Sequence, residues 1–118
     1  DLNKSQVYAV SRWINEDAGK EVIPHSSITK PPSAELKPGQ VDPFDYDVVS
    51  PLVDRIILES HNITALIDDG YSEELILELV QKVRNSEYKR RQAPPGIRVS
   101  KKAFGVGRRY PIVNKFEV

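Results

Sequence analysis

The sequence predicts a mainly α-helical fold, made of short helices with a long proline-rich loop and an irregular basic C-terminal tail. Apolar residues recur at helical spacing in several separate stretches, each bounded by residues that typically begin or end a helix. No run of alternating apolar and polar residues is long enough to indicate a sheet strand, and no internal repeat is present. A chain of 118 residues has room for one domain with a modest core.

The first helix is predicted to begin after Asn3 and to end at Gly19. Asn3 is a favourable N-cap, and Gln6, three residues later, can complete a capping box. Apolar residues follow at helical spacing, namely Leu2, Val7, Val10, Trp13 and Ile14. We expect Tyr8 and Trp13 to pack in the core, because aromatic side chains are usually buried.

Residues 20–43 are predicted to be mostly irregular because five prolines interrupt them. Only a short turn of helix fits, between His25 and Thr29. The stretch 29–40 is polar and has no apolar face to bury. Loops of this length usually serve as lids or as disordered connectors, and we expect residues 30–43 to form a mobile loop.

Helical spacing resumes at about Asp45. Apolar residues between Val48 and Ile57 follow the pattern of an amphipathic helix, in which Pro51 should mark a start or a kink rather than the middle. This helix should pack its apolar side in the core.

Two further helices are indicated by their caps. Asn62 should cap a short helix that Gly70 ends, and Ser72 should cap the next one. The buried stripe of that last helix should consist of Leu75, Ile76, Leu79, Val80 and Val83.

Charge is distributed unevenly along a chain whose formal net charge is zero. The tail, residues 89–118, holds nine Lys and Arg against one acid, a balance of 9 − 1 = +8. Residues 35–78 hold eleven acids against two bases, or 2 − 11 = −9. This asymmetry favours a polyanionic partner for the tail. Prolines and glycines break the tail, so its cations should be presented from turns and extended backbone, with Lys89 just past a helix end.

Several classes of protein are disfavoured. The chain has no cysteine, no apolar run of membrane-spanning length and no signal peptide, so we expect a cytoplasmic protein. It also lacks methionine and opens at Asp1 directly before a helix start, which suggests a piece of a longer polypeptide. His25 and His61 have no ligand partners at suitable spacing, and no nucleophile motif or phosphate-binding glycine loop is present.

Candidate binding residues are therefore cations and hydroxyls. Lys4 lies in the first turn of its helix, where free amides and the helix dipole favour an anion. Ser33 is a hydroxyl on a proline-flanked loop that could contact a phosphate or a ribose. Lys89 could bind an anion, or it could hydrogen-bond the last carbonyls of the preceding helix. The residues alone leave these alternatives open.

Several ordered segments together resemble the C-terminal third of NAD synthetase. They are residues 1–8 (DLNKSQVY), 29–36 (TKPPSAEL) and 87–92 (EYKRRQ). The tail segments 93–99 and 103–112 are similar to the glutamine-dependent form of that enzyme. The resemblance covers essentially the whole chain in the right order.

The resemblance implies a ligase that amidates deamido-NAD with ammonia from glutamine. ATP adenylates the nicotinate carboxylate, and ammonia then displaces AMP. It also implies Mg²⁺, a homo-oligomer and a Rossmann-like adenine nucleotide α-hydrolase-type domain, of which residues 1–118 would be the C-terminal fragment. The family's pyrophosphate-binding loop and magnesium ligands have no counterpart in this sequence, so the fragment alone is not expected to be catalytic.

Individual roles are implied by matching positions. Lys4 matches the lysine that contacts ATP phosphates, and Ser33 matches a residue at the start of a loop that orders over ATP. Tyr88 and Lys89 match the pair that touches deamido-NAD. Arg109 is similar to a tail arginine that reaches a neighbouring subunit's substrate. Gly107 stands where the family often has an acid.

Two readings from other classes also fit the tail. Lysines and arginines interleaved with aromatic residues are typical of modules that bind single-stranded nucleic acid. A tail that packs on another subunit would instead be an oligomerisation element. We expect the chain to be a ligase fragment rather than a nucleic-acid-binding module. No membrane partner is expected.

Overall fold

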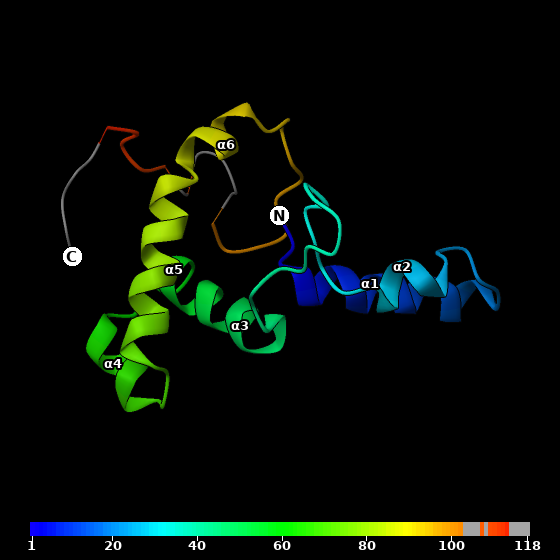
Figure 1. The fold of residues 1–118 in the computed structure, drawn as a ribbon, viewed down its shortest axis with the longest axis horizontal. Helices are drawn as coiled ribbons and strands as arrows, with labels where there is room; N and C mark the ends of the chain where they lie inside the picture. Colours follow the sequence, from blue (N-terminus) through cyan, green and yellow to red (C-terminus); the bar gives the residue numbers. More distant parts are fainter. Residues whose placement is uncertain (103–106, 108, 114–118) are drawn as a thin grey trace. The chain divides into compact units, whose positions relative to one another are not determined.

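The computed structural model describes residues 1–102, 107 and 109–113 (Figure 1). In these residues it contains six helices and no strand, so the predicted mainly α-helical fold is confirmed. The helices are α1 (Lys4–Ala18), α2 (His25–Thr29), α3 (Tyr46–Ile57), α4 (Ile63–Asp68), α5 (Glu73–Asn85) and α6 (Glu87–Gln92). The chain forms two compact units, a first unit of residues 2–50 and a second unit of residues 51–118 together with Asp1.

In the first unit, α1 begins and ends as its caps predict. The Asn3 side chain accepts from the Gln6 amide, and the Gln6 side chain accepts from the Asn3 amide, which completes the capping box. Gly19 adopts a left-handed conformation with φ of 60° and ends the helix. Asn15 then fixes the turn to α2, because its side chain bonds the backbone of Val22 and Ile23. The short helix α2 packs beside α1.

The prediction that Trp13 packs in the core is wrong. Its exposed fraction is 59%, and none of the fifteen residues of α1 is buried. Tyr8 is half-buried. Of the other apolar side chains that gave α1 its helical spacing, Leu2, Val7 and Val10 are exposed as well, and Ile14 is half-buried. The spacing identified the helix correctly, but it did not identify what the apolar side faces.

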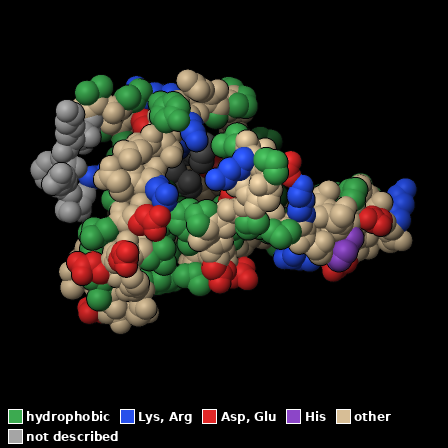
Figure 2. All heavy atoms as spheres, in the orientation of Figure 1, with side chains coloured by type: hydrophobic (Ala, Val, Ile, Leu, Met, Phe, Trp, Pro, Cys, Tyr) green, Lys and Arg blue, Asp and Glu red, His purple; other side chains and the backbone are tan. Residues whose placement is uncertain are grey.

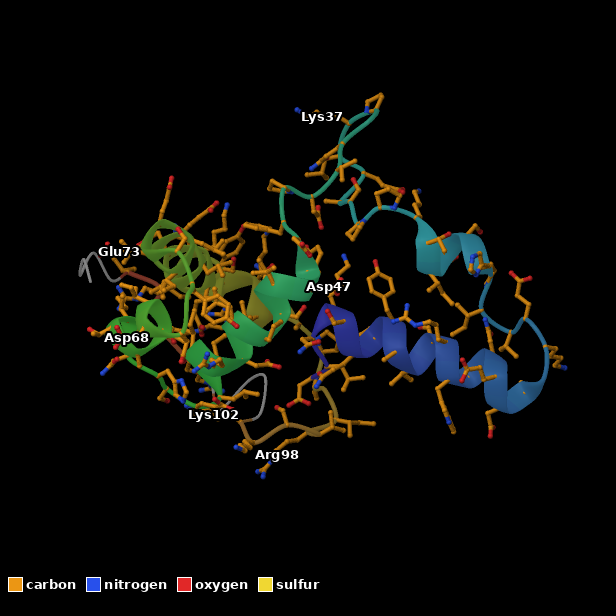
Figure 3. All side chains as sticks on the ribbon, turned by 90° about the horizontal axis from the view of Figure 1, so that it is seen from below. Lys37, Asp47, Asp68, Glu73, Arg98 and Lys102 are labelled. Carbon is orange, nitrogen blue, oxygen red and sulfur yellow. The ribbon has the colours of Figure 1, made fainter. Side chains whose placement is uncertain are left out.

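Residues 30–45 contain neither helix nor strand, and hydrogen bonds close part of this stretch into a loop. The Asp42 amide donates to the Pro32 carbonyl at 2.7 Å and joins the two ends. Near the tip, the Gln40 side chain accepts from the Leu36 amide, and the Gln40 amide donates to the Lys37 carbonyl. Lys37 lies at the far end of the loop (Figure 3). Several backbone groups of this polar segment therefore find their hydrogen-bond partners within the loop itself.

The second unit holds its core between α3, α4 and α5. Leu52, Leu66 and Ile76 are fully buried, and Leu79 is nearly so. Burying one such side chain stabilises a fold by about 1.5–3 kcal/mol. The caps predicted for the two helices are confirmed, since the side chain of Asn62 accepts from the Ala65 amide and that of Ser72 from the Leu75 amide. The remaining members of the predicted stripe on α5 are half-buried.

Two predictions about helix positions need correction. Pro51 lies in the middle of α3 rather than at its start, although a proline there removes one helical hydrogen bond and costs about 3 kcal/mol. Burial of two apolar side chains that follow Pro51 in the same helix, Leu52 and Ile57, offsets that cost. Lys89 lies within the short helix α6 instead of on an irregular segment past a helix end. The first four residues of the predicted irregular tail are thus helical.

Candidate functional site

Lys4 is held beside a carboxylate and an aromatic ring at the start of α1. Its ammonium lies 3.8 Å from Asp42 Oδ2 and 4.9 Å from the centre of the Tyr46 ring. The Tyr46 hydroxyl donates to the same carboxylate oxygen at 2.7 Å. Burial, and after it the hydrogen bond to Asp42, raises the pKa of Tyr46 to about 12, so the phenol keeps its proton at neutral pH.

The Lys4 side chain is 37% exposed and that of Asp42 is 21% exposed. A half-exposed pair at this distance is weak, with a typical contribution of about 0.2–1 kcal/mol. A phosphate group, which carries more charge than one carboxylate, can therefore compete with Asp42 for Lys4. The first turn of α1 contains no acid that would repel such an anion.

Ser33 lies in the same unit, at the base of the loop that Asp42 closes. Its hydroxyl accepts from the Glu35 amide at 3.0 Å, and it opens onto a hollow of about 550 Å³ formed by residues 30–41. Lys30 forms an ion pair with Glu35 at this hollow and lowers the pKa of that carboxyl. Because the Asp42 amide bonds the carbonyl of Pro32, Asp42 connects the surroundings of Lys4 and Ser33.

A cleft of about 400 Å³ opens beside α1 in this unit. Tyr8 and Arg12 line it from α1, Asp47 lines it from the start of α3, and Phe44 and Asp45 line it from the two residues before α3. Asp47 lies on the first turn of α3 (Figure 3). The sequence reasoning missed Arg12, although residues 4, 8 and 12 follow the four-residue spacing that places them on one face of a helix.

In the second unit, α6 separates its cations onto different sides. Glu87 is buried, with an exposed fraction of 2%, and its two carboxylate oxygens bind Arg90 Nη2 at 2.9 Å and Arg91 Nε at 3.0 Å. Residues 87, 90 and 91 share a face because they are three and four positions apart. Tyr88 and Lys89 lie outside that face and are exposed, with the Lys89 ammonium 6.0 Å from the Tyr88 ring centre.

The hydrogen bond from Arg91 is the main cause that lowers the pKa of Glu87 to about 2, in spite of its burial. The Tyr110 amide also donates to this carboxylate. The carboxylate is therefore ionised at neutral pH and satisfied by three donor groups.

An apolar pocket of about 420 Å³ lies next to Lys89. Its walls come from Val53 and Ile57 of α3, Val83 of α5 and Ala93, whereas Ser86, Lys89 and Arg90 contribute polar groups. A pocket with apolar walls and a few cations suits a ring that carries a negative charge. Acidic side chains gather elsewhere in this unit, over α4 and the start of α5, where Asp68, Asp69, Glu73 and Glu74 lie (Figure 2).

The tail is attached to its unit at several points. The Asp1 carboxylate accepts from the amides of Val99 and Ser100 and lies 2.6 Å from the Ser100 hydroxyl. Lys102 donates to the Ile57 carbonyl at 2.6 Å and to the Ser60 hydroxyl at 2.7 Å, which satisfies the C-terminal end of α3. Lys102 therefore has a structural role.

Arg109 is exposed, and its neighbour Tyr110 contacts α6. The Arg91 Nη2 donates to the Tyr110 carbonyl at 3.2 Å, and the Arg90 guanidinium lies 5.8 Å from the Tyr110 ring centre. Arg98 is exposed and points away from the ribbon (Figure 3). Arg108 and Lys115 lie outside the described residues.

Gly107 has a structural reason to lack a side chain. A Cβ atom at this position would lie 3.3 Å from backbone and side-chain atoms of Lys102, which is tighter than ordinary van der Waals contact. An acid at position 107 would therefore require Lys102 to shift by a few tenths of an ångström. This close approach is consistent with the departure from the acid expected there.

Within the described part of the chain, no group of three or more His, Cys, Asp or Glu is placed to hold a metal ion. No helix among the described residues is long and apolar enough to cross a membrane.

Comparison with known proteins identifies the class of this chain. A family described as NAD synthase matches residues 1–93. Glutamine-dependent NAD(+) synthetases of Synechocystis and of Thermotoga maritima are 44% and 38% identical to it over 98% and 99% of its length. The structure of a glutamine-dependent NAD⁺ synthetase of Acinetobacter baumannii in complex with ADP superimposes with a TM-score of 0.55 at 32% identity over 97% of this chain.

The chain therefore belongs to the NAD synthase family. Within that family, the relatives named above are the glutamine-dependent enzymes, which confirms the resemblance noted from the sequence. The chain spans about a fifth of the length of these relatives, 21% of each of the two sequences and 20% of the solved structure. The tail beyond residue 93 lies outside the family match but within the match to the relatives.

Proposed function

We propose that this chain supplies cationic substrate contacts to a ligase that converts deamido-NAD to NAD. In this reaction the nicotinate carboxylate attacks the α-phosphorus of ATP and pyrophosphate leaves. Ammonia from glutamine then attacks the acyl adenylate and displaces AMP. The residues of this chain bind and orient the substrates, and the isolated fragment is inactive.

The observation that carries this proposal is the position of Lys4 beside the loop of Ser33. Lys4 lies at a helix N-terminus that holds no acid, and its only ion pair among the described residues is a weak one with Asp42. Asp42 also closes the loop whose base carries Ser33. Phosphates of ATP that draw Lys4 away from Asp42 would reach a hydroxyl and a second cation, Lys30, on the same loop.

Such a cation contributes to catalysis because negative charge builds up on the triphosphate as pyrophosphate leaves. A fixed ammonium aimed at that charge stabilises the transition state more than the ground state. The loop of residues 30–43 can exclude water from the acyl adenylate, which would otherwise hydrolyse. Magnesium would be held by residues of the synthetase outside this chain.

The dinucleotide contacts are proposed for α6. Tyr88 and Lys89 are both exposed, and Lys89 lines the apolar pocket next to Ala93. A nicotinate ring would suit the apolar walls, and its carboxylate or a phosphate would suit Lys89. Arg109 is proposed to contact deamido-NAD of a neighbouring subunit in a homo-oligomer.

Pyrophosphate release by the intact protein tests this function. With ATP, deamido-NAD and ammonia present, Lys4→Ala should lower the rate of release by about 10²-fold or more, the scale for loss of one preorganised charge. Substitution of Lys82, a lysine of α5 with a similar surface ion pair, is the matched control and should leave the rate unchanged. Equal rates for both variants and the wild type would contradict the proposed role of Lys4.

A further inference from the structure

The buried carboxylate of Glu87 has no role in the substrate contacts proposed above. It is 2% exposed, and it is the only acid on α6. Burial of a charge is unfavourable unless it is paired and hydrogen-bonded. Arg90 and Arg91 of the same helix supply two of its partners. Pairs three and four positions apart on an exposed helix stabilise it only slightly, so these contacts alone do not account for burying the carboxylate.

The third partner comes from the tail. The Tyr110 amide donates to Glu87, and the Tyr110 carbonyl accepts from the Arg91 guanidinium at 3.2 Å. Both backbone polar groups of one tail residue are thus bound by the same ion pair. Pro111 follows directly and restricts Tyr110 to extended backbone, which favours this two-point contact. The Arg90 guanidinium lies 5.8 Å from the centre of the Tyr110 ring and adds a further contact.

We propose that Glu87 is a positioning residue that anchors Tyr110 of the C-terminal tail to α6 and thereby fixes the positions of Lys89 and Arg109, the two cations proposed to contact deamido-NAD. Glu87 binds both arginines on one face of α6, so Arg90 at the apolar pocket is already paired with a carboxylate, whereas Lys89 at the same pocket lies outside that face. It also holds Tyr110, the residue next to Arg109. The inference rests on the proposed function only for the identity of the ligand; the anchoring contact is independent of it.

Amide hydrogen exchange at Tyr110 in the intact protein tests the anchor directly. Glu87→Ala should speed exchange of this amide by about tenfold or more, because the amide loses its acceptor and the segment opens more often. Glu87→Gln keeps a carbonyl acceptor and should restore part of the protection. Glu78→Ala, which removes an exposed carboxylate paired with Lys82 on α5, is the matched control and should have no effect.

Arg91→Ala serves as a second variant in case Glu87→Ala disturbs the fold. It removes the donor to the Tyr110 carbonyl and leaves Glu87 paired with Arg90. It should also speed exchange at Tyr110. Unchanged exchange in both variants would overturn the anchor.

Kinetics separates the anchor from the site. Glu87→Ala and Arg91→Ala should raise the KM for deamido-NAD several-fold and leave the KM for ATP unchanged, which a merely structural role would not do. If Lys89→Ala raises the KM but the two anchor variants do not, the positioning role is wrong and the proposed function stands. A different outcome would separate the two ideas in the other direction. If Lys89→Ala and Arg109→Ala leave the KM for deamido-NAD unchanged, while Glu87→Ala and Arg91→Ala speed exchange of the Tyr110 amide, the proposed dinucleotide site is wrong and the anchor stands.

Discussion

Replacement of Lys4 by alanine separates a catalytic cation from a structural one, because the two effects differ in size. In the structure Lys4 makes two weak contacts, an ion pair of 3.8 Å with Asp42 and a cation–π contact of 4.9 Å with Tyr46. A half-exposed ion pair contributes about 0.2–1 kcal/mol, and an exposed cation–π contact contributes about 0.5–1 kcal/mol. Their loss should lower the free energy of unfolding by about 1 kcal/mol.

The expected kinetic effect is larger. A loss of about 10²-fold in the rate of pyrophosphate release corresponds to about 2.7 kcal/mol of transition-state stabilisation. Lys4 makes no contact of that strength in the structure described here, so the difference would have to come from charge that develops during the reaction. The KM for ATP should change less than kcat, because the ground state gains less from the ammonium than the transition state does.

The assay measures pyrophosphate release and thermal unfolding on the same preparations of wild type, Lys4→Ala and Lys82→Ala. The Lys82 variant loses a surface ion pair 3.4 Å long and controls for removal of a lysine as such. A Lys4 variant with the wild-type rate and a melting temperature lowered by several degrees would show that the lysine serves only to hold Asp42 and Tyr46.

Four further outcomes are expected. Lys89→Ala should raise the KM for deamido-NAD by about tenfold and leave the KM for ATP nearly unchanged in steady-state kinetics, and equal shifts for both substrates would contradict a local contact. Amides of residues 33–42 should exchange more slowly when a non-hydrolysable ATP analogue is bound, whereas identical exchange with and without it would indicate a static connector. The pKa of Glu87 is lowered from 4.5 to about 2, so the stabilisation from its ionised carboxylate should be complete above pH 4.5 and be lost as the pH falls toward 2. In that range, the free energy of unfolding measured in urea should depend less on pH for Glu87→Gln than for the wild type. Trp13, the single tryptophan, should be readily quenched by acrylamide in the isolated chain, and a shielded Trp13 would contradict its exposure.

Local signals in the sequence predicted the helices well because their causes lie within a few residues. The capping box of Asn3 and Gln6 and the cap at Ser72 depend on contacts three residues apart, and both are present. The prediction for Trp13 failed for a different reason. Helical spacing shows that one side of α1 is apolar, but it does not show what covers that side. The chain spans only about a fifth of its relatives, so much of what could cover it is not in this sequence.

The candidate site shows the same division between local and tertiary causes. Lys4 and Ser33 could be singled out from position and residue type, but their connection through Asp42 depends on a backbone bond from Asp42 to Pro32, ten residues apart. That bond has no signature in the sequence. Arg12 could have been found from its spacing to Lys4, since a four-residue period was already evident in the helix.

The basic tail shows why net charge is a poor guide to the partner of a segment. Its balance of +8 favours a polyanion, yet the structure commits several of the cations to internal contacts. Arg90 and Arg91 bind Glu87, which lies just outside the segment that was counted, and Lys102 satisfies the end of α3. A nucleic-acid module needs its cations on an accessible surface, where they release counterions from phosphates. Three of the tail's nine cations, Arg90, Arg91 and Lys102, are thus committed to internal contacts, so fewer cations are available to a polyanion than the net charge of the tail suggests.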